Sequence, residues 1–190
     1  MKITTRTIDT MEFQQLNDPI TTVFPGKTYE SRISRAIAKG KQEGYSHLVI
    51  YGDREHFANI HYFTGFDPRF EEALLILSED KKPLLLVGNE GLWYSKIIPF
   101  ELDVMLFQSF SLVGQPRSKD TSNVLKDAYE RVGLCKASKV GVIGWKYFTD
   151  TEAVDPKYMF DVPHFIVESL KAETGAHNLE NAAKLLIGAE

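Results

Sequence analysis

The sequence predicts an α/β domain of three layers, with a mixed β-sheet between two layers of helices. Short apolar runs recur along the chain and are typical of buried strands. Segments with helical spacing separate most of these runs, which favours parallel strands joined by crossovers. One pair is separated only by residues 78–82, SEDKK, which predicts an antiparallel hairpin. The strands are expected at His47–Tyr51, Ala73–Leu77, Pro83–Val87, Val104–Phe107 and Val140–Ile143.

The chain is expected to begin with a lead-in and a long helix. Residues 1–27 show weak periodicity and include Pro25-Gly26, which predicts an extended segment that ends in a turn. Thr28 is placed to cap a helix that runs to about Glu43. Gly44 follows where a left-handed helix end favours glycine.

A short helix is expected between the first and second strands. Asp53 is placed to cap it, and it should run through about His61 before Gly65 breaks the chain. Residues 89–100, which follow the hairpin, have no pattern that assigns them to a helix or a strand.

The C-terminal half is expected to contribute three helices. One begins at Ser118–Asp120, carries apolar residues at helical spacing and stops at Gly133. Another begins at Pro163, because proline suits the first position of a helix. The last is an amphipathic helix over Asn178–Glu190, which has no partner element after it.

This order of elements predicts one main domain with a segment on either side. Residues 1–27 form the lead-in, residues 28–175 the α/β domain, and residues 176–190 the start of a linker or a next domain. An unpartnered amphipathic helix at the end is what a chain cut near a domain boundary would show. We therefore expect this chain to be part of a longer protein.

Composition excludes several classes of function. The net charge of −4 argues against a nucleic-acid-binding surface. The single cysteine, Cys135, excludes an internal disulfide framework and suits a reducing cytoplasm. The N-terminus has no apolar signal region, and the longest apolar runs are too short to cross a bilayer. The sequence therefore predicts a soluble cytoplasmic protein.

Candidate catalytic groups are sparse. His56 and His61 are five residues apart, about 140° around a helix, whereas one metal needs a spacing of three or four. They are interpreted either as metal ligands or, more simply, as surface or core histidines. Cys135 is interpreted either as a nucleophile or as a half-buried structural thiol. No GxSxG or phosphate-binding glycine loop is present.

A charged and aromatic corner is predicted around the start of the second strand. Asp53, Arg54, His56 and Asn59 precede the aromatic segment 62–66, and Asp67, Arg69, Glu71 and Glu72 follow it. A second rim at residues 88–94 includes Asn89, Glu90, Trp93 and Tyr94. These residues either form an internal network, with Arg54 or Arg69 paired to Glu71 or Glu72, or face a cleft made with another domain or subunit.

The segment Arg54–Phe66, REHFANIHYFTGF, resembles the N-terminal domain of the creatinase, prolidase and aminopeptidase P family, the pita-bread metallopeptidase-like proteins. Members have an Asn, then an aromatic-Leu/Phe-Thr-Gly-Phe turn, then two apolar strands. Here these are Asn59, Tyr62–Phe66, Ala73–Leu77 and Leu84–Val87. The resemblance covers residues 28–170, and the insert Asp67–Glu72 and the long head depart from it.

The resemblance implies a ribonuclease-H-like fold that precedes a larger catalytic domain. In the family, that domain binds a pair of divalent metals (manganese, cobalt or zinc) through Asp, His and Glu side chains, although creatinase needs no metal. None of that domain is expected here, so no cofactor and no catalytic residue is assigned to this chain. The implied partners are the missing C-terminal catalytic domain, a second copy in a homodimer, and a peptide substrate at the shared cleft.

The leading hypothesis is a non-catalytic N-terminal domain of an Xaa-Pro peptidase or related hydrolase. It would contribute dimer contacts and the substrate entrance. An alternative is a stand-alone peptide- or protein-binding module of the same fold, and a third is an independent hydrolase that uses Cys135 or the histidines. The residues expected at the entrance or interface are Arg54, His56, Asn59, Tyr62, Asp67, Arg69, Asn89 and Glu90.

Overall fold

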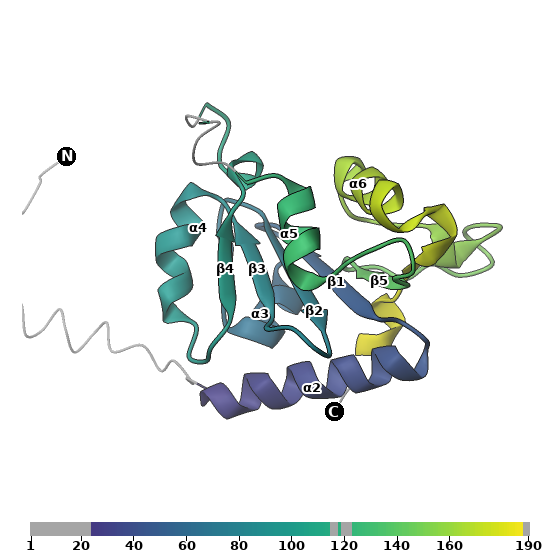
Figure 1. Cartoon of the computed structure of the whole chain (residues 1–190), viewed down its shortest axis with the longest axis horizontal. Helices are drawn as coiled ribbons and strands as arrows, with labels where there is room; N and C mark the ends of the chain where they lie inside the picture. Colours follow the sequence, from purple (N-terminus) through teal and green to yellow (C-terminus); the bar gives the residue numbers. More distant parts are fainter. Residues whose placement is uncertain (1–23, 115–117, 119–122, 188–190) are drawn as a thin grey trace, which may run out of the picture.

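A computed structural model of the chain describes residues 24–114, 118 and 123–187. Its centre is a six-stranded sheet in the order β4-β3-β2-β1-β5-β6 (Figure 1). Strand β2 is antiparallel to both of its neighbours, and the other five strands share one direction. The strands are β1 His47–Gly52, β2 Ala73–Ser78, β3 Leu84–Val87, β4 Asp103–Leu106, β5 Val140–Ile143 and β6 Leu179–Asn181. The mixed sheet and its hairpin are as predicted.

Helices cover both faces of the sheet, so the domain has three layers (Figure 1). One face packs on α5 and α6, and the other on α2, α3 and α4. The helices are α2 Gly26–Gln42, α3 Ala58–Thr64, α4 Asn89–Tyr94, α5 Leu125–Val132 and α6 His164–Thr174. The central strands β1 and β2 are buried along their whole length because both of their faces are covered. The predicted fold class is confirmed.

The register of β1 decides which side chains reach which face. His47 is opposite Ser78 and Gly52 is opposite Ala73 across the antiparallel pair. Because side chains alternate along a strand, Val49 packs toward α5 and α6 whereas Ile50 packs toward α2 and α3. His47 shares the face of Val49, so its imidazole lies near the end of α5.

Two predicted helix starts are wrong. Helix α2 begins at Gly26, with Pro25 as the preceding residue, so Thr28 is inside the helix and does not cap it. Helix α3 begins at Ala58, because the Asp53 carboxylate accepts hydrogen bonds from the backbone N–H groups of Glu55 and His56 in a separate turn before it. The left-handed end predicted at Gly65 is present, with φ 72°.

The C-terminal half also departs from the sequence prediction. Helix α5 begins at Leu125, after the expected start at Ser118–Asp120 and after residues 119–122, which are outside the described part. The predicted helix over Asn178–Glu190 is wrong: Leu179–Asn181 pairs with β5 as strand β6, and Ala183–Leu186 is a short 3-10 helix. The residues that suggested a helical stripe pack on opposite faces of the sheet, Leu179 on one and Ala182 on the other.

The remaining segments complete the outline. Of the predicted lead-in, residues 1–23 are outside the described part, and Gly26 and Lys27 belong to α2. Residues 89–100, unassigned from sequence, form α4 and a 3-10 turn.

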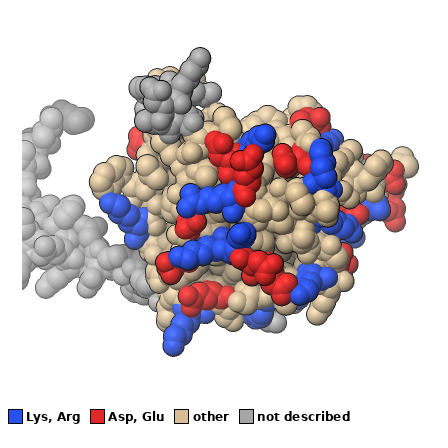
Figure 2. All heavy atoms as spheres, in the orientation of Figure 1, with Lys and Arg blue, Asp and Glu red and all other residues tan. Residues whose placement is uncertain are grey.

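No helix among the described residues combines the length and the apolar composition needed to cross a membrane. Figure 2 shows basic and acidic side chains interspersed over the face seen in Figure 1.

Candidate functional site

One end of the sheet collects the polar and aromatic residues that the sequence singles out. Strands β1, β3, β4, β5 and β6 all end there, and β2 begins there. In open α/β sheets, ligands bind outside the carboxyl ends of the strands. We call this region the carboxyl edge, formed by residues 53–57, 67–72, 88–94 and 144–146.

Two open hollows meet at the insert between α3 and β2. One, of about 400 Å³, is lined by Arg54, Asp67, Arg69 and Phe70. The other, of about 370 Å³, continues from Arg69 and Phe70 to Glu90, Trp93 and Tyr94. Four of the predicted site residues, Arg54, Asp67, Arg69 and Glu90, are therefore brought together around the exposed ring of Phe70.

Arg69 is held in an unusual backbone conformation. Its φ is +59°, in the left-handed region that non-glycine residues adopt infrequently. The Asp67 carboxylate accepts a hydrogen bond from the Arg69 N–H at 2.7 Å, which closes this turn. The Arg69 guanidinium then lies 4.8 Å from the centre of the Tyr94 ring, a cation–π contact. The insert therefore places a cation between the two hollows.

The carboxylates expected to pair with these arginines point inward. Glu71 is only 3% exposed, and its carboxylate accepts the backbone N–H groups of Glu90 and Gly91 at 3.2 and 2.8 Å. Glu72 accepts a hydrogen bond from the Tyr51 hydroxyl at 3.0 Å, and burial raises the pKa of this carboxyl. Within the described part of the chain, neither arginine forms the ion pair that the internal-network interpretation predicted.

The loops after β1 and β5 are joined through His56. Its Nδ1 lies 3.1 Å from Asp53 Oδ1, and its ring stacks on the indole of Trp145. Partial burial would raise the pKa of Asp53, but hydrogen bonds from the N–H groups of His56 and Glu55 hold it below its usual value. At this corner of the carboxyl edge, His56 and Trp145 thus form an aromatic surface, and the ionised carboxylate of Asp53 contacts His56.

Asn59, Tyr62 and Asn89 have structural contacts. The Asn59 amide donates to the Gly144 carbonyl at 2.7 Å and ties α3 to the end of β5. Tyr62 is part of the contact between α3 and α2, where the Arg32 guanidinium lies 4.3 Å from its ring centre. The N–H of Asn89 donates to the Ser111 hydroxyl, so this residue turns toward the loop after β4.

Some exposed aromatic residues of the edge were not among the residues expected at the entrance or interface, although Trp93 was placed in the second rim. Trp93 is 73% exposed, and the ammonium of Lys96 lies 3.7 Å from its ring centre. Phe70 and Trp145 are also substantially exposed. Trp145 lies in the loop that follows β5, and Phe70 lies in the loop before β2, whereas Trp93 is on α4. For Trp145 and Phe70 the available signal was a large apolar side chain in a loop near a strand end, since such side chains often serve recognition.

The described residues include no obvious chemical centre. No three His, Cys, Asp or Glu side chains among them are grouped so as to hold a metal ion. Cys135 is exposed, which corrects the half-buried position expected for it. A hydrogen bond from Ser138 lowers the pKa of its thiol, but no histidine is among its hydrogen-bond partners in this part of the chain.

The chain resembles known proteins in its three-dimensional structure. No family model matches the chain, and no curated protein matches it either. Solved structures do match. The prolidase from Pyrococcus horikoshii OT3 aligns with 82% of this chain at a TM-score of 0.52 and 12% identity, and the dipeptidase PepE from Mycobacterium ulcerans with 86% at 0.56 and 15%. An Xaa-Pro aminopeptidase from Streptococcus thermophilus aligns with 85% at 0.52 and 19%.

The chain has the fold of the domain with which it aligns in these prolidase, dipeptidase and Xaa-Pro aminopeptidase structures. The resemblance seen in Arg54–Phe66 is thereby confirmed at the level of the fold. The chain spans 33% and 37% of the prolidase and PepE chains, but 97% of the S. thermophilus chain. Similarity at these identities shows the fold alone, because one fold hosts many functions.

Proposed function

We propose that this chain is the non-catalytic N-terminal domain of a pita-bread metallopeptidase-like protein of the Xaa-Pro peptidase type. Its carboxyl edge would contact the catalytic domain or a second copy in a homodimer and form part of the entrance for a peptide substrate. The supporting observation is that Phe70 and Trp93 are exposed beside Arg54 and Arg69, around two adjoining hollows.

The aromatic and arginine side chains of the carboxyl edge favour recognition of a peptide or a partner protein there. Aromatic side chains and arginine are enriched in interfaces, where they supply apolar area and directional hydrogen bonds. Because Glu71 and Glu72 bond to backbone and tyrosine groups, they do not neutralise Arg54 and Arg69. The guanidinium groups are thus available to the carboxylate of a peptide or of a partner protein.

The proposal places the chemistry elsewhere in the protein. A pair of divalent metals, manganese, cobalt or zinc, would belong to the catalytic domain, since the described residues of this chain contain no suitable ligand cluster. Such a pair activates water and polarises the scissile carbonyl. The cytoplasm is the proposed compartment because the single cysteine suits a reducing environment.

The mass of the protein in its own cells tests the first part of the proposal. An immunoblot against this domain should show a band well above 21.6 kDa. In that protein, Arg69→Ala should raise KM for Xaa-Pro peptides about tenfold, the effect of losing one charge-assisted contact. The thermal midpoint should change little, because Arg69 is exposed. Lys126→Ala, on α5, is the matched control and should leave KM unchanged.

Two results would contradict parts of this proposal. If Arg69→Ala lowers the thermal midpoint and leaves the kinetics normal, the arginine supports the fold and the entrance assignment is wrong. A native band at 21.6 kDa would favour the stand-alone peptide- or protein-binding module. A partner captured by the wild type but not by Phe70→Ala would then identify the binding edge.

A further inference from the structure

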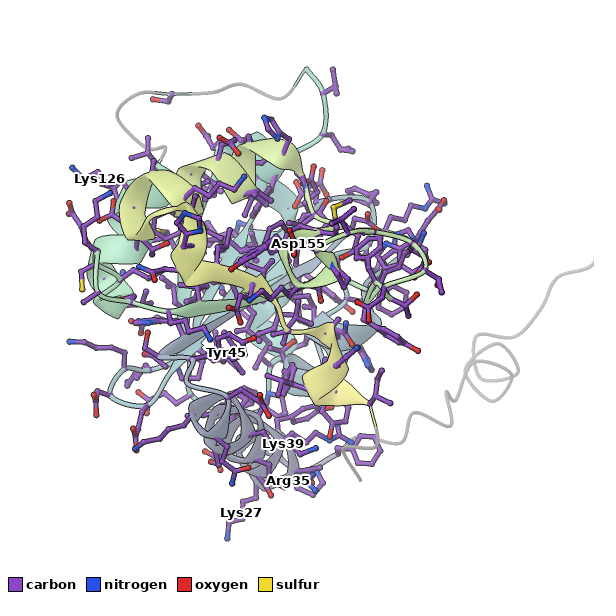
Figure 3. All side chains as sticks on the ribbon, turned by 90° about the vertical axis from the view of Figure 1, so that its right-hand side faces the viewer. Lys27, Arg35, Lys39, Tyr45, Lys126 and Asp155 are labelled. Atoms are coloured by element: carbon purple, nitrogen blue, oxygen red, sulfur yellow. The ribbon has the colours of Figure 1, made fainter. Side chains whose placement is uncertain are left out.

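A third hollow lies at the opposite end of the sheet from the carboxyl edge. It has a volume of about 410 Å³, within the range of small-molecule sites. Its walls are the C-terminal part of α2 and the turn after it, the β2–β3 turn, and the C-terminal end of α5. We call it the amino-edge cleft. Figure 3 labels Tyr45, which lines it.

Ser78 lines the cleft, and its hydroxyl is buried without a hydrogen-bond partner among the described residues. Ser78, the last residue of β2, is 8% exposed, and its Oγ bonds to no other described group. Buried polar groups in folded proteins nearly always have a partner in the protein, in ordered water or in a ligand. A molecule bound in the cleft is one such partner, reached when the serine side chain rotates about its single χ angle.

The beginning of β1 gives the cleft a neutral, ordered floor. The imidazole of His47 donates from Nε2 to the Val132 carbonyl at 3.0 Å. Its Nδ1 lies 2.9 Å from Ser46 Oγ, whose hydroxyl is also within 3.1 Å of the Lys139 carbonyl. Burial lowers the pKa of His47, although the Val132 carbonyl opposes this effect. The Tyr45 hydroxyl donates to Glu180 at 3.1 Å, which fixes the ring. Apolar parts of Ile37, Tyr45 and Val132 also line the hollow.

The rim carries two charged groups of opposite sign that form no direct ion pair with a described residue, although Asp80 is near enough to Lys41 to help raise the pKa of its ammonium group. Lys41 and Glu79 neutralise each other at 2.7 Å. Asp80 and Lys81, which follow in the same turn and line the cleft, form no ion pair or hydrogen bond with any described residue. A ligand with a single charge would leave one of these groups unmatched, whereas a ligand with both charges could match both.

We propose that the amino-edge cleft binds a small zwitterion, a free amino acid or a dipeptide. Its ammonium group would face Asp80, its carboxylate would face Lys81, and Ser78 Oγ would gain a hydrogen-bond partner. An apolar side chain would rest against Ile37 and Val132. This inference is independent of the function proposed for the carboxyl edge, because the two regions lie at opposite ends of the sheet.

Titration of the intact chain with L-leucine tests the proposal by amide NMR chemical shifts. The expected result is a saturable millimolar interaction whose shifts are confined to residues 44–47, 78–81 and 132–133. N-acetyl-L-leucine amide, which has the same side chain and neither charge, should not bind. Asp80→Asn and Lys81→Gln should each weaken binding about tenfold, as expected from loss of one charged contact. Asp155→Asn, which Figure 3 places away from Tyr45, should bind like the wild type.

Ser78→Ala separates a binding role from a structural one. Since Ser78 Oγ has no partner to lose, the variant should unfold at the same or a slightly higher denaturant concentration, yet bind L-leucine several-fold more weakly. The proposal is overturned if L-leucine causes no localised shifts at millimolar concentration. It is also overturned if the uncharged N-acetyl amide binds equally well, or if Asp80→Asn and Lys81→Gln bind like the wild type.

Discussion

The imidazole of His56 lies flat on the indole of Trp145, with ring centroids 4.2 Å apart and planes 13° from parallel. His56 follows β1 and Trp145 follows β5, so the stack joins two neighbouring loops of the carboxyl edge. The Asp161 carboxylate accepts the N–H groups of Trp145 and Lys146 at 2.6 and 2.7 Å. The His56–Trp145 stack and the Asp161 carboxylate therefore fix the first residues of the long loop after β5.

The first prediction concerns this loop. Trp145→Ala removes the stack and should speed amide hydrogen exchange in residues 146–160, with a loss of about 1 kcal/mol of unfolding free energy. Trp93→Ala is the matched control, because Trp93 is 73% exposed and contacts the ammonium of Lys96, as Trp145 contacts the ammonium of Lys146. It should leave exchange in this loop unchanged. Equal exchange in the two variants would show that the stack does not anchor the loop.

The second prediction concerns the buried carboxylate of Glu71. Glu71→Gln keeps the shape of the side chain but replaces one acceptor oxygen by an NH₂ group that faces the N–H donors of Glu90 and Gly91. The loss should be about 1–3 kcal/mol of unfolding free energy, measured by urea denaturation. A change within experimental error would mean that these N–H groups are satisfied in another way.

The third prediction concerns the neighbouring residue and its pH dependence. Burial raises the pKa of Glu72 in the folded state, so the folded protein holds this proton more tightly than the unfolded chain. The stabilising effect is complete below the unfolded pKa, near 4.3 for glutamate, and is lost as pH rises through the folded pKa. Glu72→Gln should therefore be neutral or stabilising at pH 7, with a benefit that shrinks toward pH 4. A destabilising effect at pH 7 would contradict this sign.

Much of the fold could be predicted because its strands are apolar on both faces. The bounds of Val140–Ile143 match the structure, since each of its residues is buried and the run stands out in the sequence. Strand β6 could not be found in this way. It is a short edge strand, and the side chains around it alternate between the two faces of the sheet, which gives a spacing that also suits a helix.

The candidate site was predictable in location but not in detail. The meeting of Arg54, Asp67, Arg69 and Glu90 follows from strands that end or begin at one edge, which a hairpin and parallel crossovers already imply. The inward turn of Glu71 depends on α4, which has no sequence pattern of its own. Charge alone therefore suggested an ion pair between Glu71 and an arginine, whereas in the structure the Glu71 carboxylate accepts hydrogen bonds from backbone N–H groups.

The fourth prediction concerns His47, which burial keeps neutral in the folded protein by lowering its pKa. The unfolded chain takes up a proton as pH falls below about 6.5, whereas the folded protein does so only at a lower pH. The stability linked to His47 is thus complete above pH 6.5 and is lost as pH falls through the folded pKa, by at most about 1.4 kcal/mol per pH unit. His47→Gln should flatten urea-derived stability between pH 7 and pH 5, and His177→Gln, which replaces an exposed histidine, should not. If the wild type and His47→Gln show the same slope, His47 is not the group whose protonation opposes the fold.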